Sequence, residues 1–181
     1  MKASINQVQL SETNLMLKGV TKNAPKIISR ALNKTVSKGR TLSSKKIREQ
    51  VSLKAKYVKE KLHIKKATWK KLSASISAES RGLILTNYVT GVDSNGNFKV
   101  KIKKKGKAKI ITNAFLTTVN AGSRKVDVIA VRDPATNKLK VLYGPSVSQV
   151  FNTVRDDIDK ELVDYLAVVS ERELDAVLRG F

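Results

Sequence analysis

The sequence contains no cysteine, a single histidine and few aromatic residues. Without cysteine the chain can form neither disulfides nor cysteine-based zinc sites. The lone His63 cannot build a His/Cys dyad or a histidine-rich metal centre, and we expect it to face solvent or cap a helix. The sequence contains no run of about 18 apolar residues, which is the length that a membrane-spanning helix needs. The N-terminal residues lack the apolar core of a secretory signal. We therefore expect a protein that is made and folded in a cytoplasm.

The motifs of catalysis and of nucleotide binding are also missing. Acidic residues are concentrated at 156–164, where a solvated face or a subunit contact explains them better than acid–base catalysis. The segment 93–97 has its glycine at the fourth position, whereas a calcium loop needs glycine at the sixth and glutamate at the twelfth. Neither glycine-rich phosphate-binding motif occurs. We expect no enzymatic activity, no catalytic residue, no metal site and no cofactor.

Positive charge is what the chain has in excess, with a formal net charge of +21. Residues 1–110 carry 27 Lys and Arg against 5 Asp and Glu, a net +22, whereas residues 151–181 carry 4 against 8, a net −4. Surface lysine often serves solubility alone. An excess of this size favours a polyanionic partner, or packing of the basic part of one subunit against the acidic part of another.

The first third of the chain is predicted to be helical and basic. Asn23 and Pro25 have the residue types of a helix start, and Gly39 is a position where the helix could bend. A shorter helix is expected over 52–64. The pair 40–51 and 54–62 resembles a helix-turn-helix, but any two basic amphipathic helices joined by a short turn would do so. The apolar stripe expected at helical spacing consists of Ile28, Leu32, Val36, Ile47 and Val51.

The middle of the chain changes to the two-residue period of β-strands. Turns are expected at 93–97, where Asn-Gly is a hairpin signal, at 104–107 and at 133–137. Gly144, Pro145 and Ser146 form a fold-defining turn, because glycine permits a sharp turn, proline fixes φ and serine can cap the next helix. The expected strands are 72–78, 83–89, 98–102, 108–119, 126–131 and 138–142.

A long helix is expected over 148–178. The acidic residues in its first half stabilise it, because negative charge near the N-terminus of a helix interacts favourably with the helix dipole. The order of elements predicts an α+β fold: N-terminal helices, a central antiparallel β-sheet with a lysine-rich hairpin, and a long C-terminal helix. We expect one structural domain with helical extensions. It consists of a basic helical region (1–64), a sheet region (65–147) and an acidic helix (148–181).

Two lysine clusters and one acidic row are the candidate interaction sites. Lysine suits phosphate attraction better than base reading, and the aromatic content of 5% disfavours single-strand binding by stacking. Two interpretations of the lysine clusters stand as equal alternatives. The lysines contact duplex DNA, or they form a solvated face or dock on an acidic protein. A membrane surface ranks behind both, because the bulky apolar residues have core spacing.

The three sets are defined by their residues. The first cluster is Lys99, Lys101, Lys103, Lys104, Lys105, Lys107 and Lys109. The second surrounds Trp69 and contains Lys65, Lys66, Lys70 and Lys71, with Lys54, Lys56, Lys59 and Lys61 before it in sequence. The acidic row, an expected subunit interface, is Asp156, Asp157, Asp159, Glu161 and Asp164.

Two blocks of the sequence carry a family resemblance. The first contains Ala-Leu-Asn-Lys-Thr-Val at 31–36, Arg-Thr-Leu at 40–42, Lys-Ile-Arg at 46–48 and most of 51–58. The second is Leu-Tyr-Gly-Pro-Ser-Val at 142–147, followed by Val-Phe at 150–151 and the long helix. Together with a strand-rich, lysine-rich middle, these blocks resemble the minor tail protein Z (tail completion) family of long-tailed phages, over about residues 24–180.

The resemblance implies a non-enzymatic structural protein of the virion. Such a protein acts late in tail assembly at the head-proximal end of the tail, the neck, where it completes the tail and helps position genome DNA. The implied partners are the tail terminator, the tail tube and head-completion proteins, and the implied assembly is a six-fold ring built in the bacterial host cytoplasm. No membrane partner is expected. The alternative is a free, sequence-nonspecific nucleic-acid-binding protein that uses the helix pair at 40–62 and the lysine hairpin.

Overall fold

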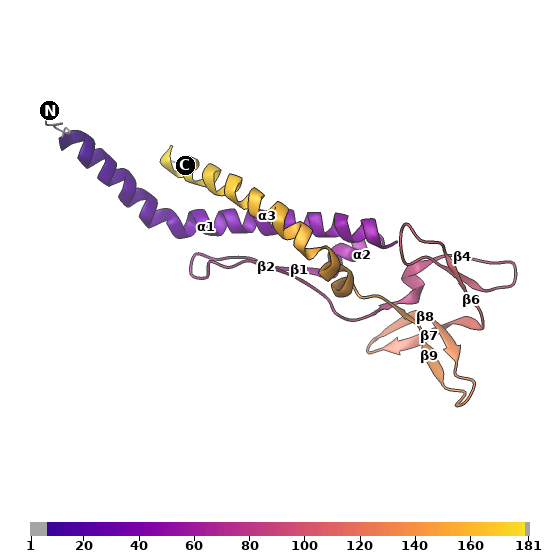
Figure 1. Cartoon of the computed structure of the whole chain (residues 1–181). Helices are drawn as coiled ribbons and strands as arrows, with labels where there is room; N and C mark the ends of the chain where they lie inside the picture. The colour runs from indigo at the N-terminus through magenta and orange to yellow at the C-terminus, as the bar shows by residue number, and fades with distance from the viewer. Residues whose placement is uncertain (1–6, 180–181) are drawn as a thin grey trace. The chain divides into compact units, whose positions relative to one another are not determined.

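The computed structural model describes the backbone of residues 7–179 and the side chains of residues 23–179. A long helix comes first in the chain, short strands follow, and a second long helix ends the described part (Figure 1). The chain divides into two compact units. One consists of the chain up to Arg40, Ile64–Ile76 and the chain from Asp157, and the other of Thr41–His63 and Ser77–Asp156. The predicted α+β class is confirmed. Among the described residues no helix is long and apolar enough to cross a membrane.

Helix α1 (Gln7–Gln50) is continuous for 44 residues. The predicted helix start at Asn23 and Pro25 is wrong, because Pro25 lies inside α1. The segment before it contains three Leu, two Lys and two Gln, which favour the helix and offset the N–H bond that proline cannot make. Gly39 does not break the helix either. A Cβ there would lie 2.6 Å from Ile76 Cδ1 and 2.8 Å from Leu162 Cδ1, so glycine permits close packing.

The buried face of α1 differs by one position from the predicted stripe. Ile28 is 43% exposed, and its neighbour Ile27 is buried instead. Ile27, Ala31 and Thr35 follow one another at four-residue spacing on this face, and Val36 and Ile47 extend it as predicted.

The segment after α1 forms less helix than predicted. Helix α2 (Ala55–Glu60) has six residues, and the chain then continues as strand β1 (Leu62–Lys65), which pairs with β2 (Ser75–Ala78) in a two-stranded sheet. The prediction of helix up to residue 64 is therefore wrong for β1, in which Leu62 is buried as a strand residue. Helix α2, which would be the second helix of the helix-turn-helix, is three residues shorter than the predicted 54–62.

The predicted strand at 83–89 is interrupted. Strand β3 (Leu83–Ile84) leads into a 3-10 turn, η1 (Leu85–Tyr88), before β4 (Val89–Val92) begins. The interruption places Tyr88 in the core, where it is 1% exposed and its hydroxyl donates a 3.0 Å hydrogen bond to the carbonyl of Pro145. Burial raises the pKa of Tyr88 to about 12.

The turn at 93–97 is confirmed. The Asp93 carboxylate accepts hydrogen bonds from the backbone N–H of Asn95 and Asn97, and Gly96 has a φ of +80°. The turn connects β4 to β5 (Phe98–Val100), and β5 also pairs with β6 (Lys109–Ile111). The Asn97 side chain and these backbone donors hold the pKa of Asp93 below its ordinary value.

The remaining strands form a third antiparallel set. Strand β7 (Ala114–Ala121) pairs with β8 (Arg124–Arg132), and β8 pairs with β9 (Leu139–Val141). The strand predicted at 108–119 is split into β6 and β7 by a turn in which Asn113 has a φ of +58°. The turn at 133–137 is confirmed, because Asp133 accepts hydrogen bonds from the N–H of Ala135 and Thr136. The antiparallel character is as predicted, but the strands of the described chain form four small sheets, not one.

The fold-defining turn begins at Gly144, the last residue of β10 (Tyr143–Gly144), and leads into α3 (Val147–Leu178). A Cβ at Gly144 would lie 2.5 Å from Tyr88 Cε2, so only glycine fits against this buried ring. Ser146 caps α3 as predicted: its Oγ accepts from the Gln149 N–H, and the Gln149 side chain accepts from the Ser146 N–H. The predicted C-terminal helix is confirmed. Its buried face contains Val147, Val150, Val154, Ile158 and Val169.

Candidate functional site

The lysine hairpin, residues 98–111, is exposed at nearly every lysine. Lys101 is half-buried, and the others of the first cluster are exposed. The hairpin is fastened through its backbone: the Lys104 N–H donates to the Gln50 carbonyl at 2.9 Å, and the Ser52 N–H donates to the Ile102 carbonyl at 2.9 Å. The lysine side chains are thus presented from a fixed main chain.

The register of this hairpin divides its lysines between two faces. Val100 lies opposite Lys109, and Lys99 lies opposite Ile110. Because directly opposite residues share a face, Lys109 is on the face of the buried Val100, whereas Lys99 is on the other. The alternation predicted for β5 is present, but the lysines do not form one continuous ladder across both strands.

The second cluster lies on the Trp69 loop, by which we mean residues 65–72 at the end of β1. Lys65, Lys66, Lys70 and Lys71 are all exposed, and Trp69 is 66% exposed. The Lys70 ammonium lies 4.9 Å from the centre of the Trp69 ring, within range of a cation–π interaction. Trp69 and its four lysines are therefore brought together at one loop.

The Trp69 loop is held in place from α1. The side-chain amide of Asn33 accepts a 2.8 Å bond from the Ala67 N–H and donates a 3.0 Å bond to the Ala67 carbonyl. Thr68 and Lys71 close the tip through two backbone bonds of 2.9 and 3.1 Å. Asn33 was not among the predicted site residues, because its effect depends on a contact 34 positions away.

The lysines that precede the Trp69 loop differ in their surroundings. Lys54, Lys56 and Lys59 are exposed. Lys61 contacts the Glu79 carboxylate at 2.6 Å. This hydrogen bond lowers the pKa of Glu79, and it leaves Lys61 less able to contact a partner than the exposed lysines are.

The predicted acidic row is exposed on α3 at every position. Asp157, Glu161 and Asp164 follow one another at spacings of four and three, so they share one side of the helix. Asp156 and Asp159 point to other sides, and Asp156 lies 3.5 Å from the Arg155 guanidinium. The row is therefore one group of three with two flanking carboxylates.

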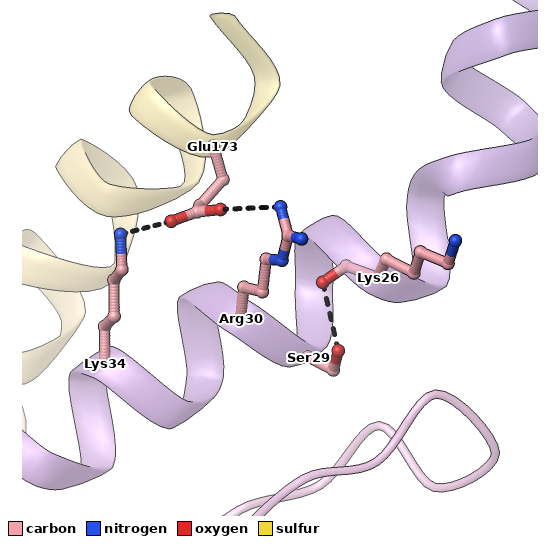
Figure 2. A network of polar contacts seen from close by, with 5 residues as sticks. All are labelled: Lys26, Ser29, Arg30, Lys34 and Glu173. Atoms are coloured by element: carbon pink, nitrogen blue, oxygen red, sulfur yellow. Dashed lines mark hydrogen bonds and ion pairs between the residues drawn. The ribbon is translucent and has the colours of Figure 1, made fainter. Parts of the chain in front are cut away.

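One ionic contact with a buried carboxylate was not predicted. The Glu173 side chain on α3 is 7% exposed and lies between Lys34, with which it forms an ion pair, and Arg30, whose Nη1 is 4.0 Å from Oε2 (Figure 2). Lys26 extends away from this carboxylate in Figure 2. A signal was available in the sequence, because Glu173 falls four residues after Val169 on the otherwise apolar stripe of α3.

Charged surfaces are the main candidate features of the described chain. The single histidine, His63, is exposed, and no group of acidic or histidine side chains among the described residues could hold a metal ion. What the described surface offers is a basic hairpin, a basic loop with an exposed tryptophan, and an acidic helix.

The comparisons agree with the two resemblance blocks. No curated protein and no solved structure matches the chain significantly. A family model, described as prophage minor tail protein Z (GPZ), matches residues 10–181, and the chain belongs to that family.

Proposed function

We propose that this phage tail protein completes the tail at its head-proximal end. It forms a six-fold ring with the tail terminator or the tail tube, next to head-completion proteins, and helps position the genome DNA. The single observation that carries the proposal is the family match over residues 10–181, which supports a structural, non-enzymatic role in the virion. Assembly into the particle takes place in the bacterial host cytoplasm.

The charge distribution supports a ring of identical copies. A chain with a net +22 over residues 1–110 and a net −4 over residues 151–181 has two unlike surfaces. Unlike surfaces that recognise each other join copies head to tail, and such contacts close into rings when the rotation permits. In this arrangement the acidic row is a subunit interface.

The lysine hairpin is the part of the proposal that concerns DNA. Six of its seven lysines are exposed, from Lys99 to Lys109, and exposed ammonium groups attract phosphates without reading sequence. The hairpin faces either the DNA in the channel of the ring or an acidic neighbouring protein.

Cryo-EM of the head–tail junction, with a tag on the C-terminus, tests the location. The expected result is a ring of density at the neck around the tail axis. Particles carrying Lys103→Gln, Lys104→Gln and Lys105→Gln serve as the matched variant for the hairpin: if the ring density is unchanged but no longer touches the DNA, the hairpin is the DNA-facing surface. Absence of the protein from purified virions would overturn the proposal.

A free nucleic-acid-binding protein is the second candidate, favoured by the exposure of the hairpin lysines. It predicts that the isolated protein binds duplex DNA with a steep salt dependence. The triple glutamine variant should flatten the slope of log K against log [salt] by about 0.9 for each phosphate that the protein no longer neutralises. Negligible duplex affinity of the wild-type protein at about 50 mM salt would exclude this function.

A further inference from the structure

The Trp69 loop has the properties of a preformed contact site. Trp69 is the only tryptophan of the chain and is 66% exposed, and Leu72 beside it is 41% exposed. Both bonds from Asn33 and both bonds across the tip hold the loop in the shape that displays the ring. A loop that is already ordered loses little conformational entropy on binding, and a large aromatic side chain surrounded by cations is a typical interface anchor.

A complementary surface exists on α3 of the same chain. Seven exposed residues follow at alternating spacings of four and three and so form one side of the helix, which we call the α3 stripe. Val168 lies at its centre between acidic residues on both sides. The exposed basic residues Lys160 and Arg172 lie at the edges of this side of the helix, Lys160 three residues after Asp157 and Arg172 four residues after Val168. The α3 stripe is Asp157, Glu161, Asp164, Val168, Glu171, Asp175 and Leu178.

We propose that the Trp69 loop of one copy docks on the α3 stripe of a second copy, with the indole ring against Val168 and the loop lysines against the acidic residues on either side. The pairing combines opposite charges with an apolar contact at its centre. The segment from Ile64 to Ile76 contains four lysines and no acidic residue, whereas the α3 stripe contains five carboxylates. Asp164 and Glu171 lie about 10 Å apart along the helix, which leaves room for an indole ring between them.

The docking contact is heterologous, because the two surfaces are different parts of the chain. Each copy offers one loop and one stripe, so a copy can contact two neighbours and a closed ring results if the rotation permits. The inference rests on the proposed function only in its use of a ring of identical copies. Duplex DNA fits the Trp69 loop less well, because an indole ring gains most from stacking on unpaired bases.

Self-association of the purified full chain tests the contact. Sedimentation velocity measures the assembly state, and Trp69 reports the contact directly because no other tryptophan contributes to the emission. With rising protein concentration the emission should shift to the blue and become less accessible to acrylamide, as the ring leaves water.

Two variants that each damage a different surface give the sharper test. Trp69→Ser damages the loop, and Asp164→Lys with Glu171→Lys damages the stripe. Each variant alone should associate at least about thirty-fold more weakly than the wild type, as for the loss of a central anchor. An equimolar mixture should form heterodimers and nothing larger, because one intact loop meets one intact stripe. Glu60→Lys, an exposed charge reversal on α2 outside both the α3 stripe and the acidic row, is the matched control and should associate like the wild type.

Four results would overturn the inference. These are a wild-type chain that stays monomeric, a mixture that fails to pair while both variants keep wild-type circular dichroism, a Glu60→Lys variant as weak as the stripe variant, and a tryptophan shift caused by short duplex DNA but not by a second copy. The location in the virion is measured independently. A monomeric protein that is found at the neck overturns only this contact, whereas an assembling protein that is absent from virions overturns only the proposed function.

Discussion

Replacing Glu173 with glutamine is expected to lower the free energy of unfolding by about 1–2 kcal/mol. The Glu173 side chain is 7% exposed, but the side chains of its partners Arg30 and Lys34 are 58% and 61% exposed. Once the carboxylate is gone, both cations can return to water at little cost. The loss is therefore limited to the charge-assisted contact itself.

Removing the cations is expected to cost more than removing the acid. Changing both Arg30 and Lys34 to methionine keeps the unbranched aliphatic stems over Glu173 but leaves its buried carboxylate without a counter-charge. An uncompensated buried charge destabilises by about 3 kcal/mol or more. The asymmetry between the two changes follows from the difference in exposure across the ion pair.

Urea denaturation followed by circular dichroism at the helix band, in dilute solution, measures both variants. Glu171→Gln is the control, because Glu171 is exposed on the same helix, and it should stay within about 0.5 kcal/mol of the wild type. The reasoning is refuted if Glu173→Gln also stays within that limit, or if the double methionine variant is no less stable than Glu173→Gln.

Three further changes have expected outcomes. Tyr88→Phe should cost about 1 kcal/mol at neutral pH, because it removes the hydroxyl that donates to Pro145. The wild-type advantage should then shrink between pH 10 and pH 12, because the unfolded chain releases the tyrosine proton near pH 10 and the folded chain retains it to about pH 12. Gly144→Ala should cost about 1–3 kcal/mol, because its Cβ would lie 2.5 Å from the ring of Tyr88, and thermal unfolding measures the loss. Asn33→Ala should cost about 2 kcal/mol and speed amide exchange in the Trp69 loop, because a buried N–H and carbonyl lose their partner.

Each of these changes has a result that would contradict it. A constant difference between Tyr88→Phe and the wild type across the alkaline range would show that the hydroxyl does not resist ionisation in the fold. Gly91→Ala is the control for Gly144, since an added Cβ at Gly91 meets no atom within 4 Å. Equal losses at both glycines would exclude the ring contact as the cause. Unchanged exchange in the Trp69 loop of Asn33→Ala would show that the asparagine does not hold it.

The elements predicted correctly from the sequence are those whose signals are local. The start of α3 follows from Ser146 and Gln149, which cap each other across three residues. The hairpin turn follows from Asp93 and Gly96, because the carboxylate accepts from nearby N–H groups and glycine accepts a positive φ. Both signals depend on contacts between residues only two to four positions apart, so they can be recognised in the sequence alone.

The errors come from positions where distant contacts decide the structure. Gly39 was predicted to bend the helix. In the structure it makes room for the side chains of Ile76 and Leu162, and the helix continues through it. Tyr88 interrupts a strand because its ring and hydroxyl are bound 57 positions away, at Pro145. Lys99 and Lys109 lie on opposite faces of the hairpin. Their faces are set by the register in which β5 pairs with β6, and the sequence does not give that register.

The candidate site was predicted as a set of charges, but its arrangement was not. Composition alone indicates the basic and acidic surfaces, because charge counts need no fold. The pinning of the Trp69 loop by Asn33 and the burial of Glu173 depend on α1 lying against other segments of its unit. The roles of both lysine clusters and of the acidic row stay predictions, as does the division at residues 64 and 147.

The division of the chain into two units has a consequence for the order of folding during synthesis. One unit draws on the chain up to Arg40 and again on the chain from Asp157, whereas the other is complete once Asp156 has been made. The unit with the lysine hairpin can therefore fold on the ribosome while α1 still lacks the helix that carries Glu173. Until that helix emerges, Arg30 and Lys34 have no Glu173 to bind, and the apolar contact of Leu162 at Gly39 is missing. The nascent chain should be most prone to aggregation, and most in need of a chaperone, in that interval.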